Sequence, residues 1–291
     1  MSIIELRDLS KLYGFGDATT VALDEVNLVI NEGEFVAVMG PSGCGKSTLM
    51  NMIGLLDRPT HGQYLLKGQP VERLRPTRRA KIRRDTIGFV FQFFNLLPRL
   101  TVLENVALPL TYKGITSRRR MKQALNMLER VGLSGREFFY PRHLSGGQAQ
   151  CVAIARALIN NPRIIIADEP TGNLDSASSR LVMEMLSEIH KTGNTILFVT
   201  HNPELTRYAT RVVYMHDGGI VQDEQTRLGE ISATARKVMY TIPVTTEEDD
   251  LAGVSTLMKA LPSRDKDSTK RTVVKKKSPR GKTRKARSKK S

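Results

Sequence analysis

The hydrophobic residues of the chain fall into short continuous runs and into stretches with helical spacing. Continuous apolar runs with the length of buried strands occur at four places: 35–39, 86–91, 163–167 and 195–200. Helical spacing follows the first run, with Leu49, Met52, Ile53 and Leu56 on one face. Residues 176–191 have a second such face, and 101 to about 160 are mostly helical. Strands alternating with helices predict an α/β fold with a mainly parallel sheet.

Two further patterns mark the ends of this region. Apolar stretches at 1–10 and 26–30 predict strands of a separate N-terminal sheet region, and 212–215 with 219–222 predict a closing hairpin. The helical segment, about 95–160, interrupts the sheet as a subdomain. We therefore expect one domain over residues 1–223.

The pattern changes after this domain. Within a C-terminal extension, 224–263, polar and acidic residues 245–250 precede Leu251, Val254, Leu257, Met258 and Leu261, which predicts a short capped amphipathic helix. The tail 264–291 carries 14 Lys/Arg and 2 Asp/Glu, most of the net charge of +16, and its composition predicts disorder. The remaining charge is nearly balanced, which argues against a globular nucleic-acid-binding domain.

Other features bear on the compartment. No stretch approaches eighteen consecutive apolar residues, so we expect no membrane-spanning helix. The opening residues MSIIELRDLSK lack a basic segment followed by an apolar one, and we expect no signal peptide. The two cysteines, Cys44 and Cys151, are too few for a disulfide framework. These features predict a cytoplasmic protein.

A phosphate-binding loop follows the run 35–39. The stretch GPSGCGKS fits G-x-x-x-x-G-K-[ST] and lies between an apolar strand and an amphipathic helix, where that motif is specific. Its glycines would let backbone N–H groups approach phosphates, with Lys46 on the β- and γ-phosphates and Ser47 on Mg²⁺. The residues assigned to it are Gly40, Pro41, Ser42, Gly43, Cys44, Gly45, Lys46, Ser47 and Thr48.

Two other strand ends carry polar side chains. The run IIIADEP ends in Asp168 and Glu169, where Asp168 would hold Mg²⁺ and Glu169 would act as the general base that orients the attacking water. Two solvated acids at a strand end are the alternative. His201 follows the run 195–200 and is placed to contact the γ-phosphate, although a histidine after a strand is more often a surface residue.

A second potential anion site lies about a hundred residues after the first. In LSGGQAQCVAIARAL, a glycine-rich turn at Ser145 to Gly147 opens a helix with apolar residues at helical spacing. The N-terminus of such a helix attracts anions. A chain with a complete phosphate loop has no evident need for a second one.

Taken in order, these motifs resemble the ATP-binding subunit of an ABC transporter. The resemblance covers about residues 2–222 and resolves the duplication, because in this family two copies face each other head to tail. The LSGGQ helix of each copy closes over the ATP held by the other. The residues implied in trans are Leu144, Ser145, Gly146, Gly147, Gln148 and Asp175.

The resemblance also assigns individual roles. Gln92, in FVFQ, would be a catalytic residue and Mg²⁺ ligand, and Tyr13 would stack on the adenine. Lys46, Glu169 and His201 complete the catalytic set, with Ser47 and Asp168 as further Mg²⁺ ligands. The implied cofactors are ATP and Mg²⁺, and the implied state is a homodimer. A separate integral membrane permease would read the dimer's motion through the groove near Gln92, which places the chain on the inner face of the membrane.

Several stretches resemble one branch of the family. GLLDRPTHGQY (54–64), IGFVFQFFNLLPRLTVLENVALPL (87–110) and ADEPTGNLDS (167–176) are similar to the branch for macrolide and peptide export and lipoprotein release. Its permeases have few transmembrane helices and a large external domain. An ATPase of a cell-division complex that controls cell-wall hydrolysis, and a soluble ABC ATPase outside transport, are the alternatives. For the basic tail we favour anionic lipid over nucleic acid, because the tail has no aromatic residues to stack bases.

The chain departs from the family pattern in the signature helix. The family commonly has LSGGQQQR, whereas Ala149 and Cys151 stand here in place of a glutamine and an arginine. We expect weaker contacts around this helix and no effect on the residues that contact phosphate. Oxidation of Cys44 could block ATP, but we favour the interpretation of this cysteine as a small loop residue.

Overall fold

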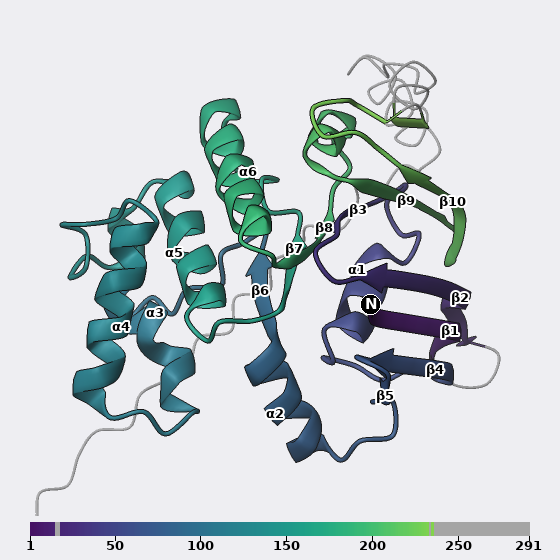
Figure 1. Cartoon of the computed structure of the whole chain (residues 1–291), viewed down its shortest axis with the longest axis horizontal. Helices are drawn as coiled ribbons and strands as arrows, with labels where there is room; N and C mark the ends of the chain where they lie inside the picture. Colours follow the sequence, from purple (N-terminus) through teal and green to yellow (C-terminus); the bar gives the residue numbers. More distant parts are fainter. Residues whose placement is uncertain (15–17, 233, 236–291) are drawn as a thin grey trace, which may run out of the picture. The chain divides into compact units, whose positions relative to one another are not determined.

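The computed structural model describes residues 1–14, 18–232 and 234–235. All of them lie in one compact unit, Met1–Ile242. Figure 1 shows its two sheets and the group of helices beside them. Among the described residues, no helix is both long and apolar enough to cross a membrane. The helix expected within 245–261 and the tail 264–291 lie outside the described residues, as does most of the expected extension 224–263.

The central sheet has six strands in the order β10-β9-β3-β8-β7-β6. Its five parallel strands are β3 (Phe35–Met39), β6 (Ile87–Phe91), β7 (Ile164–Asp168), β8 (Thr195–Val199) and β9 (Arg211–His216). The sixth, β10 (Gly219–Gln225), pairs antiparallel with β9 as the expected hairpin. The predicted α/β fold with a mainly parallel sheet is confirmed.

Both faces of the central sheet are covered, which explains the continuous apolar runs. Val36 and Val38 of β3 face the cluster that includes α1 (Lys46–Ile53) and the N-terminal sheet. Phe35 and Ala37 face the opposite cluster, which includes α6 (Ser176–Lys191). The helix α2 (Pro76–Thr86), rich in arginine, precedes β6 and has no buried residue.

The second sheet is antiparallel, in the order β2-β1-β4-β5. Its strands are β1 (Ser2–Tyr13), β2 (Thr20–Asn31), β4 (His61–Leu66) and β5 (Gln69–Pro70). Two of these were expected, although β1 and β2 extend beyond 1–10 and 26–30. The strands β4 and β5 were not expected from the sequence. In β4 only Tyr64 and Leu66 are buried, so its apolar pattern is too short to identify a strand.

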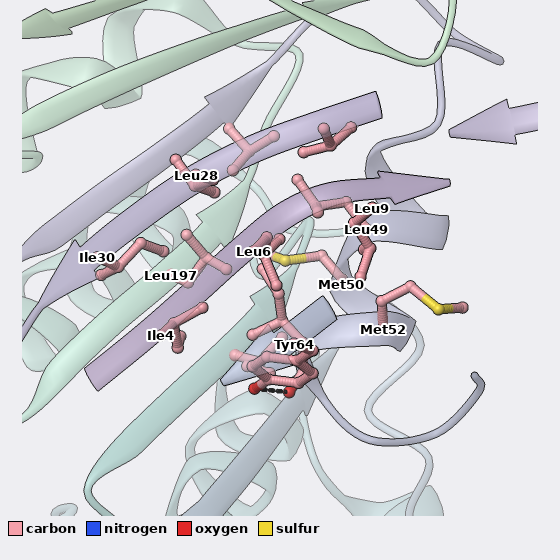
Figure 2. Packing of buried hydrophobic residues seen from close by; sticks show 14 of the residues in the cluster. Ile4, Leu6, Leu9, Leu28, Ile30, Leu49, Met50, Met52, Tyr64 and Leu197 are labelled. Atoms are coloured by element: carbon pink, nitrogen blue, oxygen red, sulfur yellow. Dashed lines mark hydrogen bonds between the residues drawn. The ribbon is translucent and has the colours of Figure 1, made fainter. Parts of the chain in front are cut away.

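The core between the two sheets is built around α1. Figure 2 shows Leu9 of β1 beside Leu49 of this helix and Leu6 beside Met50. Tyr64 is 1% exposed and donates its hydroxyl hydrogen bond to the Ile53 carbonyl at 2.8 Å, where α1 ends. The helix that follows the phosphate loop is therefore fixed along its length by the N-terminal sheet.

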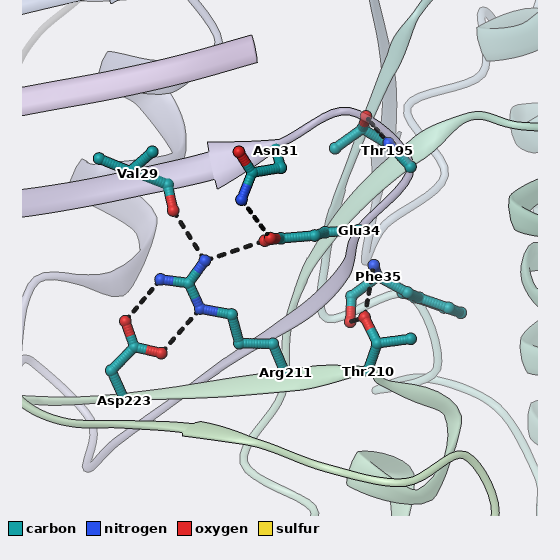
Figure 3. Close-up of polar contacts among 9 residues, drawn as sticks. Val29, Asn31, Glu34, Phe35, Thr195, Thr210, Arg211 and Asp223 are labelled. Atoms are coloured by element: carbon teal, nitrogen blue, oxygen red, sulfur yellow. Dashed lines mark hydrogen bonds and ion pairs between the residues drawn. The ribbon is translucent and has the colours of Figure 1, made fainter. Parts of the chain in front are cut away.

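A second connection between the two sheets is made by Arg211 of β9, whose side chain is largely buried. Figure 3 shows Arg211 of β9 donating to both carboxylate oxygens of Asp223, at 2.7 and 2.6 Å. It also donates to the Val29 carbonyl at 2.7 Å and to Glu34 Oε2 at 2.9 Å. The hydrogen bonds with Asp223, followed by those with Glu34, raise the pKa of Arg211 despite burial. One side chain thus connects β9, β10, β2 and the turn before β3.

The helical segment predicted at about 95–160 is present. It contains α3 (Val102–Thr111), α4 (Ser117–Arg130) and α5 (Gly146–Leu158), whose apolar residues form a cluster of their own. Thr101 and Glu104 make a capping box at the start of α3. Figure 1 shows this group beside β6, on the side away from α1.

Candidate functional site

The phosphate loop, Gly40–Ser47, connects β3 to α1. Gly40 has φ +152°, and a Cβ atom there would lie 2.2 Å from the Met215 carbonyl oxygen, so only glycine fits. Gly45 is the N-cap of α1, without a side-chain cap, and the first turn holds no acidic residue. The helix N-terminus therefore presents backbone N–H groups and a positive dipole end to an anion.

Lys46 lies inside this loop. The residue is only 8% exposed. Its Nζ donates hydrogen bonds to the Gly40 carbonyl at 2.9 Å and to the Pro41 carbonyl at 2.7 Å. The Cys44 Sγ is 3.7 Å from the same Nζ and is itself buried. These carbonyl acceptors hold the ammonium inside the loop, and a lysine in a glycine-rich loop that leads into a helix is the arrangement that binds the phosphates of a nucleotide. Cys44 occupies the position of a small buried loop residue.

The order of the parallel strands brings the candidate residues to one edge of the central sheet. The phosphate loop follows β3, His201 comes two residues after β8, Asp168 ends β7 with Glu169 next to it, and Gln92 follows β6. These four strands are neighbours, and ligands of open α/β sheets bind outside the carboxyl ends of the strands. The fold therefore brings these candidate residues to one edge of the central sheet.

The acidic pair at the end of β7 is electrostatically unusual. Burial and the nearby charge of Glu169 raise the pKa of Asp168, while Lys46 lowers it. Glu169 has φ +43°, a left-handed conformation that costs energy for a non-glycine residue and often marks functional positions. Its Oε1 is 3.2 Å from His201 Nδ1. The structure thus places Glu169 and His201 within hydrogen-bond distance of each other.

Gln92 is held by the segment after Glu169. Its Nε2 is 3.5 Å from Asn173 Oδ1, and Asn173 Nδ2 donates to the Gln92 carbonyl at 3.2 Å. A Cβ atom on Gly172 would lie 2.7 Å from Gln92 Nε2, so the two segments are in close contact. Gln92 therefore contacts the turn that begins at Glu169.

Sequence reasoning did not assign a role to Gln150 in α5. Its side chain is fully buried and donates to the Pro170 carbonyl at 2.7 Å and to the Phe91 carbonyl at 3.4 Å. It thus joins the signature helix to the residues beside Glu169 and Gln92. A polar residue in the apolar stripe of α5 was the available signal, since buried polar groups are almost always hydrogen-bonded.

Arg156 acts in the same region. It donates to the carbonyls of Phe94, at 2.7 Å, and Asn95, at 2.5 Å. Both residues have positive φ, +59° and +49°, so the arginine stabilises a strained turn just after Gln92. Burial lowers the pKa of Arg156.

The signature stretch opens α5 as predicted. Ser145 is its N-cap and forms a capping box with Gln148. A Cβ atom on Gly147 would lie 2.8 Å from Ser178 Oγ in α6, so glycine permits the close approach of the two helices. Leu144 and Gly146 complete the turn. The helix packs against α3, α4, α6 and β6, whereas α1 packs against β2 and β7.

Asp175 and Cys151 have local roles that the sequence did not reveal. Asp175 is the N-cap of α6, and its side chain accepts hydrogen bonds from the backbone N–H groups of Ala177 and Ser178. The hydrogen bond from Ser178 contributes most to the lowered pKa of Asp175. Cys151 is 4% exposed in the apolar cluster of the helical segment, and burial raises its pKa to about 11. The thiol is part of this core, and the expected weakening of contacts around the helix stays a prediction.

A large groove lies between α2, β6, α3 and α5, and its lining includes Phe91, the residue before Gln92, but not Gln92 itself. Its volume is about 970 Å³, and it is lined by apolar residues such as Phe89, Leu108, Pro109 and Tyr112. The charged side chains in its lining are all cationic among the described residues: Lys81, Arg83, Arg84 and Arg156. Arg84 is paired with Asp85, just outside the lining.

The oxygen donors at the site suit Mg²⁺. A Ser47 hydroxyl and an Asp168 carboxylate are hard ligands, and Mg²⁺ usually takes one or two such protein ligands with substrate phosphates and waters. Among the described residues, no group of three or more His, Cys, Asp or Glu could hold a metal by itself. The donor set therefore fits a metal that binds together with a nucleotide.

Comparisons with known proteins decide the family. The family model described as "ABC transporter" matches residues 23–172. The chain belongs to the ABC transporter ATP-binding family. It is an ATPase with the phosphate-loop NTPase fold.

Several relatives are similar over most of the chain. An uncharacterised ABC transporter ATP-binding protein of Methanocaldococcus jannaschii is 52% identical over 220 residues, which cover 76% of this chain and 98% of that protein. The macrolide export ATP-binding/permease protein MacB of Hyphomonas neptunium is 48% identical over 221 residues. These cover 76% of this chain but 34% of MacB.

Among solved structures, the ATP-binding cassette MJ0796 is similar. Its dimeric post-hydrolysis state, bound to ADP and Pi, has a TM-score of 0.72 and 45% identity, and the match covers 77% of this chain and 99% of that one.

Proposed function

We propose that this ABC ATPase forms a head-to-tail homodimer that encloses two ATP and drives a separate membrane permease. The observation that supports this most is the division of its anion sites. The phosphate loop lies at the carboxyl edge of the central sheet, while the Ser145 end of α5 belongs to the helical segment and packs against different elements. A second chain would bring the two together. The dimer in the structures of MJ0796 supports the same assembly.

Within this dimer each side chain has a defined task. The loop amides and Lys46 bind the phosphates, and Tyr13 stacks on the base. Glu169 accepts a proton from the attacking water, and His201, 3.2 Å away, orients that carboxylate and contacts the γ-phosphate. In trans, Ser145 and the amides of Gly146 and Gly147 bind the γ-phosphate of the partner's ATP, with the dipole of α5 behind them.

Ser47, Asp168 and Gln92 would hold the Mg²⁺. When bound, this ion neutralises charge that develops on the phosphates. Burial and the neighbouring Glu169 raise the pKa of Asp168, and the negative charge of Glu169 adds to the attraction for a cation at this point.

Two variants test the chemistry. Lys46→Ala should abolish ATP binding, because no other buried cation lies in the loop among the described residues. Glu169→Gln should bind ATP but hydrolyse it about 10²–10⁴-fold more slowly, the usual contribution of a general base. Glu188→Gln is a matched control, since that exposed carboxylate pairs only with Lys191 at the surface. Rapid turnover by Glu169→Gln would disprove its assignment as the base.

Mixing variants tests the dimer. Ser145→Arg mixed with Lys46→Ala leaves one intact composite site, which joins Lys46 of the first chain to Ser145 of the second. We expect an ATP-dependent heterodimer on a sizing column, although neither variant dimerises alone. Absence of any heterodimer would contradict contact in trans.

The groove near Gln92 is the proposed docking site for a cytoplasmic helix of the permease. Its apolar lining is open, with Tyr112 70% exposed, and its cationic side chains would favour an acidic flank on that helix. The similarity to MacB, a protein that joins an export ATPase and a permease in one chain, supports export through a permease with few membrane helices and a large external domain. Such a permease would hold this chain on the cytoplasmic face of the membrane, where the basic tail meets anionic lipid.

A pull-down identifies the partner. Tagged Glu169→Gln, solubilised from membranes with ATP and Mg²⁺, should retain a permease with about four membrane helices and a large external domain. Tyr112→Asp should lose it, while Phe138→Asp, equally exposed at 76% but outside the groove lining, should not. A many-helix permease with a soluble binding protein would indicate an importer. A partner that controls cell-wall hydrolysis would indicate the division complex.

A further inference from the structure

The residue assigned to the nucleotide base does not stand free on the surface. Tyr13 is the last residue of β1 and 42% exposed, and its hydroxyl donates to Asp57 Oδ2 at 2.9 Å. Lys11 Nζ lies 2.8 Å from the same Oδ2 and 4.7 Å from the centre of the Tyr13 ring. One carboxylate thus fixes the edge of the ring while an ammonium covers part of one face. Lys11, Tyr13 and Asp57 are called the base clamp below.

The base clamp connects the adenine position to the phosphate loop. Lys11 and Tyr13 are two residues apart in β1, and the 4.7 Å from Lys11 Nζ to the ring centre places the two side chains together. Asp57 comes just after α1, and its backbone N–H donates to the Asn51 carbonyl within that helix at 3.3 Å. The helix that presents its N-terminus to the phosphates therefore carries, at its other end, the anchor for the tyrosine.

The clamp itself is held from several sides. Lys11 Nζ donates a further hydrogen bond to the Arg58 carbonyl at 2.8 Å, and its side chain is only 12% exposed. The Arg58 N–H donates to Asp57 Oδ1 at 2.7 Å. Backbone contacts of Thr60 with β1 fix the loop that contains Asp57: its N–H donates to the Ser10 carbonyl at 2.8 Å. The position of Tyr13 is therefore determined by more than its own strand.

The charges of the clamp support this geometry. Burial alone would raise the pKa of Asp57, but hydrogen bonds from Lys11, the Arg58 amide and Tyr13 outweigh it, and the pKa is lowered. Burial, followed by the hydrogen bond to Asp57, raises the pKa of Tyr13, and a hydrogen bond with Thr48 in the first turn of α1 lowers it in part. At neutral pH the carboxylate is an acceptor and the phenol a donor.

We propose that Lys11 and Asp57 are positioning residues for the nucleotide base, which hold one face of the Tyr13 ring against an ammonium so that the base stacks on the opposite face. This inference rests on the proposed function, in which Tyr13 contacts the adenine. A cation on one face of an aromatic ring draws π-electrons towards itself. The opposite face becomes poorer in electrons and attracts an electron-rich purine. Recognition of the base then depends on the clamp, and recognition of the phosphates on the loop.

A comparison of ADP with pyrophosphate isolates the base. Dissociation constants for both, each with Mg²⁺, are measured by calorimetry on the full chain and on Lys11→Met and Asp57→Asn. We expect roughly threefold weaker ADP binding for each variant, the scale of an exposed cation–π contact, and unchanged pyrophosphate binding. The KM for ATP should rise by the same factor without a change in kcat. Lys11→Arg should restore ADP affinity, because arginine also stacks on aromatic faces.

Two further variants complete the design. Tyr13→Ala should weaken ADP binding on the order of tenfold to a hundredfold, the range for base–aromatic stacking, without changing pyrophosphate binding. Lys67→Met is the matched control, since Lys67 forms an exposed pair with Glu32 at 3.8 Å, and it should change neither constant. If Asp57→Asn does not fold, Lys11→Met and Lys11→Arg carry the test.

The results that would contradict these expectations distinguish a failure of the base clamp from a failure of base stacking on Tyr13. ADP affinity unchanged in Lys11→Met and Asp57→Asn but lost in Tyr13→Ala would overturn the clamp and leave the stacking intact. Unchanged affinity in Tyr13→Ala would overturn the stacking itself, and the clamp with it, but not the ATPase reaction. Equal losses for ADP and pyrophosphate would show that these residues support only the phosphate loop.

Discussion

Replacement of Arg211 by methionine should destabilise the whole domain. The variant keeps an unbranched apolar stem but removes the four hydrogen bonds to Asp223, Val29 and Glu34. The Arg211 side chain is 11% exposed, so the group lost is almost fully buried. Because it joins two strands of the central sheet to the N-terminal sheet, its loss loosens the contact between them.

The expected loss follows from the burial of the partners. Removal of one member of a buried ion pair typically costs about 3–5 kcal/mol, since the other charge remains unpaired. Here the side chain of Glu34 is 18% exposed and that of Asp223 is 37% exposed, so water reaches both carboxylates after the change. We therefore expect a smaller loss of about 2–3 kcal/mol. For a domain of this size the melting temperature should fall by about 5–10 °C.

Urea unfolding of the full chain without nucleotide measures the free energy directly. Arg207→Met is a matched control, because Arg207 is 42% exposed and pairs with Glu204 at 3.4 Å on the surface. Such exposed pairs contribute about 0–1 kcal/mol. A loss for Arg211→Met no larger than that of the control would refute the reasoning, and with it the role of this arginine as the connection between the sheets.

Three other predictions concern single features. Gln150→Leu should lower kcat with little change in the KM for ATP, and should cost about 1 kcal/mol of stability through the lost bond to the Pro170 carbonyl, as measured by steady-state kinetics and urea unfolding. Cys151 should react with a thiol reagent only on unfolding, because burial raises its pKa to about 11; rapid labelling of the native protein would contradict this placement. Deletion of 264–291 should leave phosphate release unchanged, whereas a large loss would give the tail a role in turnover.

The strands that carry the site were predictable because the central sheet is buried on both faces. Continuous apolar runs such as IIIAD leave few other interpretations, and polar residues at their carboxyl ends then meet at one edge. The strand β4 was missed because it begins with exposed His61, Gly62 and Gln63. Its buried half is only Tyr64 and Leu66, and their partners in β1 are distant in sequence.

Some properties of the site depend on contacts between residues distant in the sequence, and the hydrophobic pattern and the motifs do not reveal them. The positive φ of Glu169 follows from the turn that brings it to His201, and no residue type signals it. The burial of Cys151 is another such property, because the family pattern has arginine at this position. The thiol lies among the apolar residues of the helical segment.

The buried amide of Gln150 has a consequence for the two ATP sites of the proposed dimer. It belongs to the helix whose N-terminus would contact one nucleotide, yet it is bonded to the residue directly after Glu169, which acts on the other. If α5 shifts when one site of the proposed dimer is occupied, this hydrogen bond would carry the shift to the segment beside the base of the other site. We then expect the two hydrolysis events to be coupled and turnover to rise with ATP concentration in a sigmoidal curve.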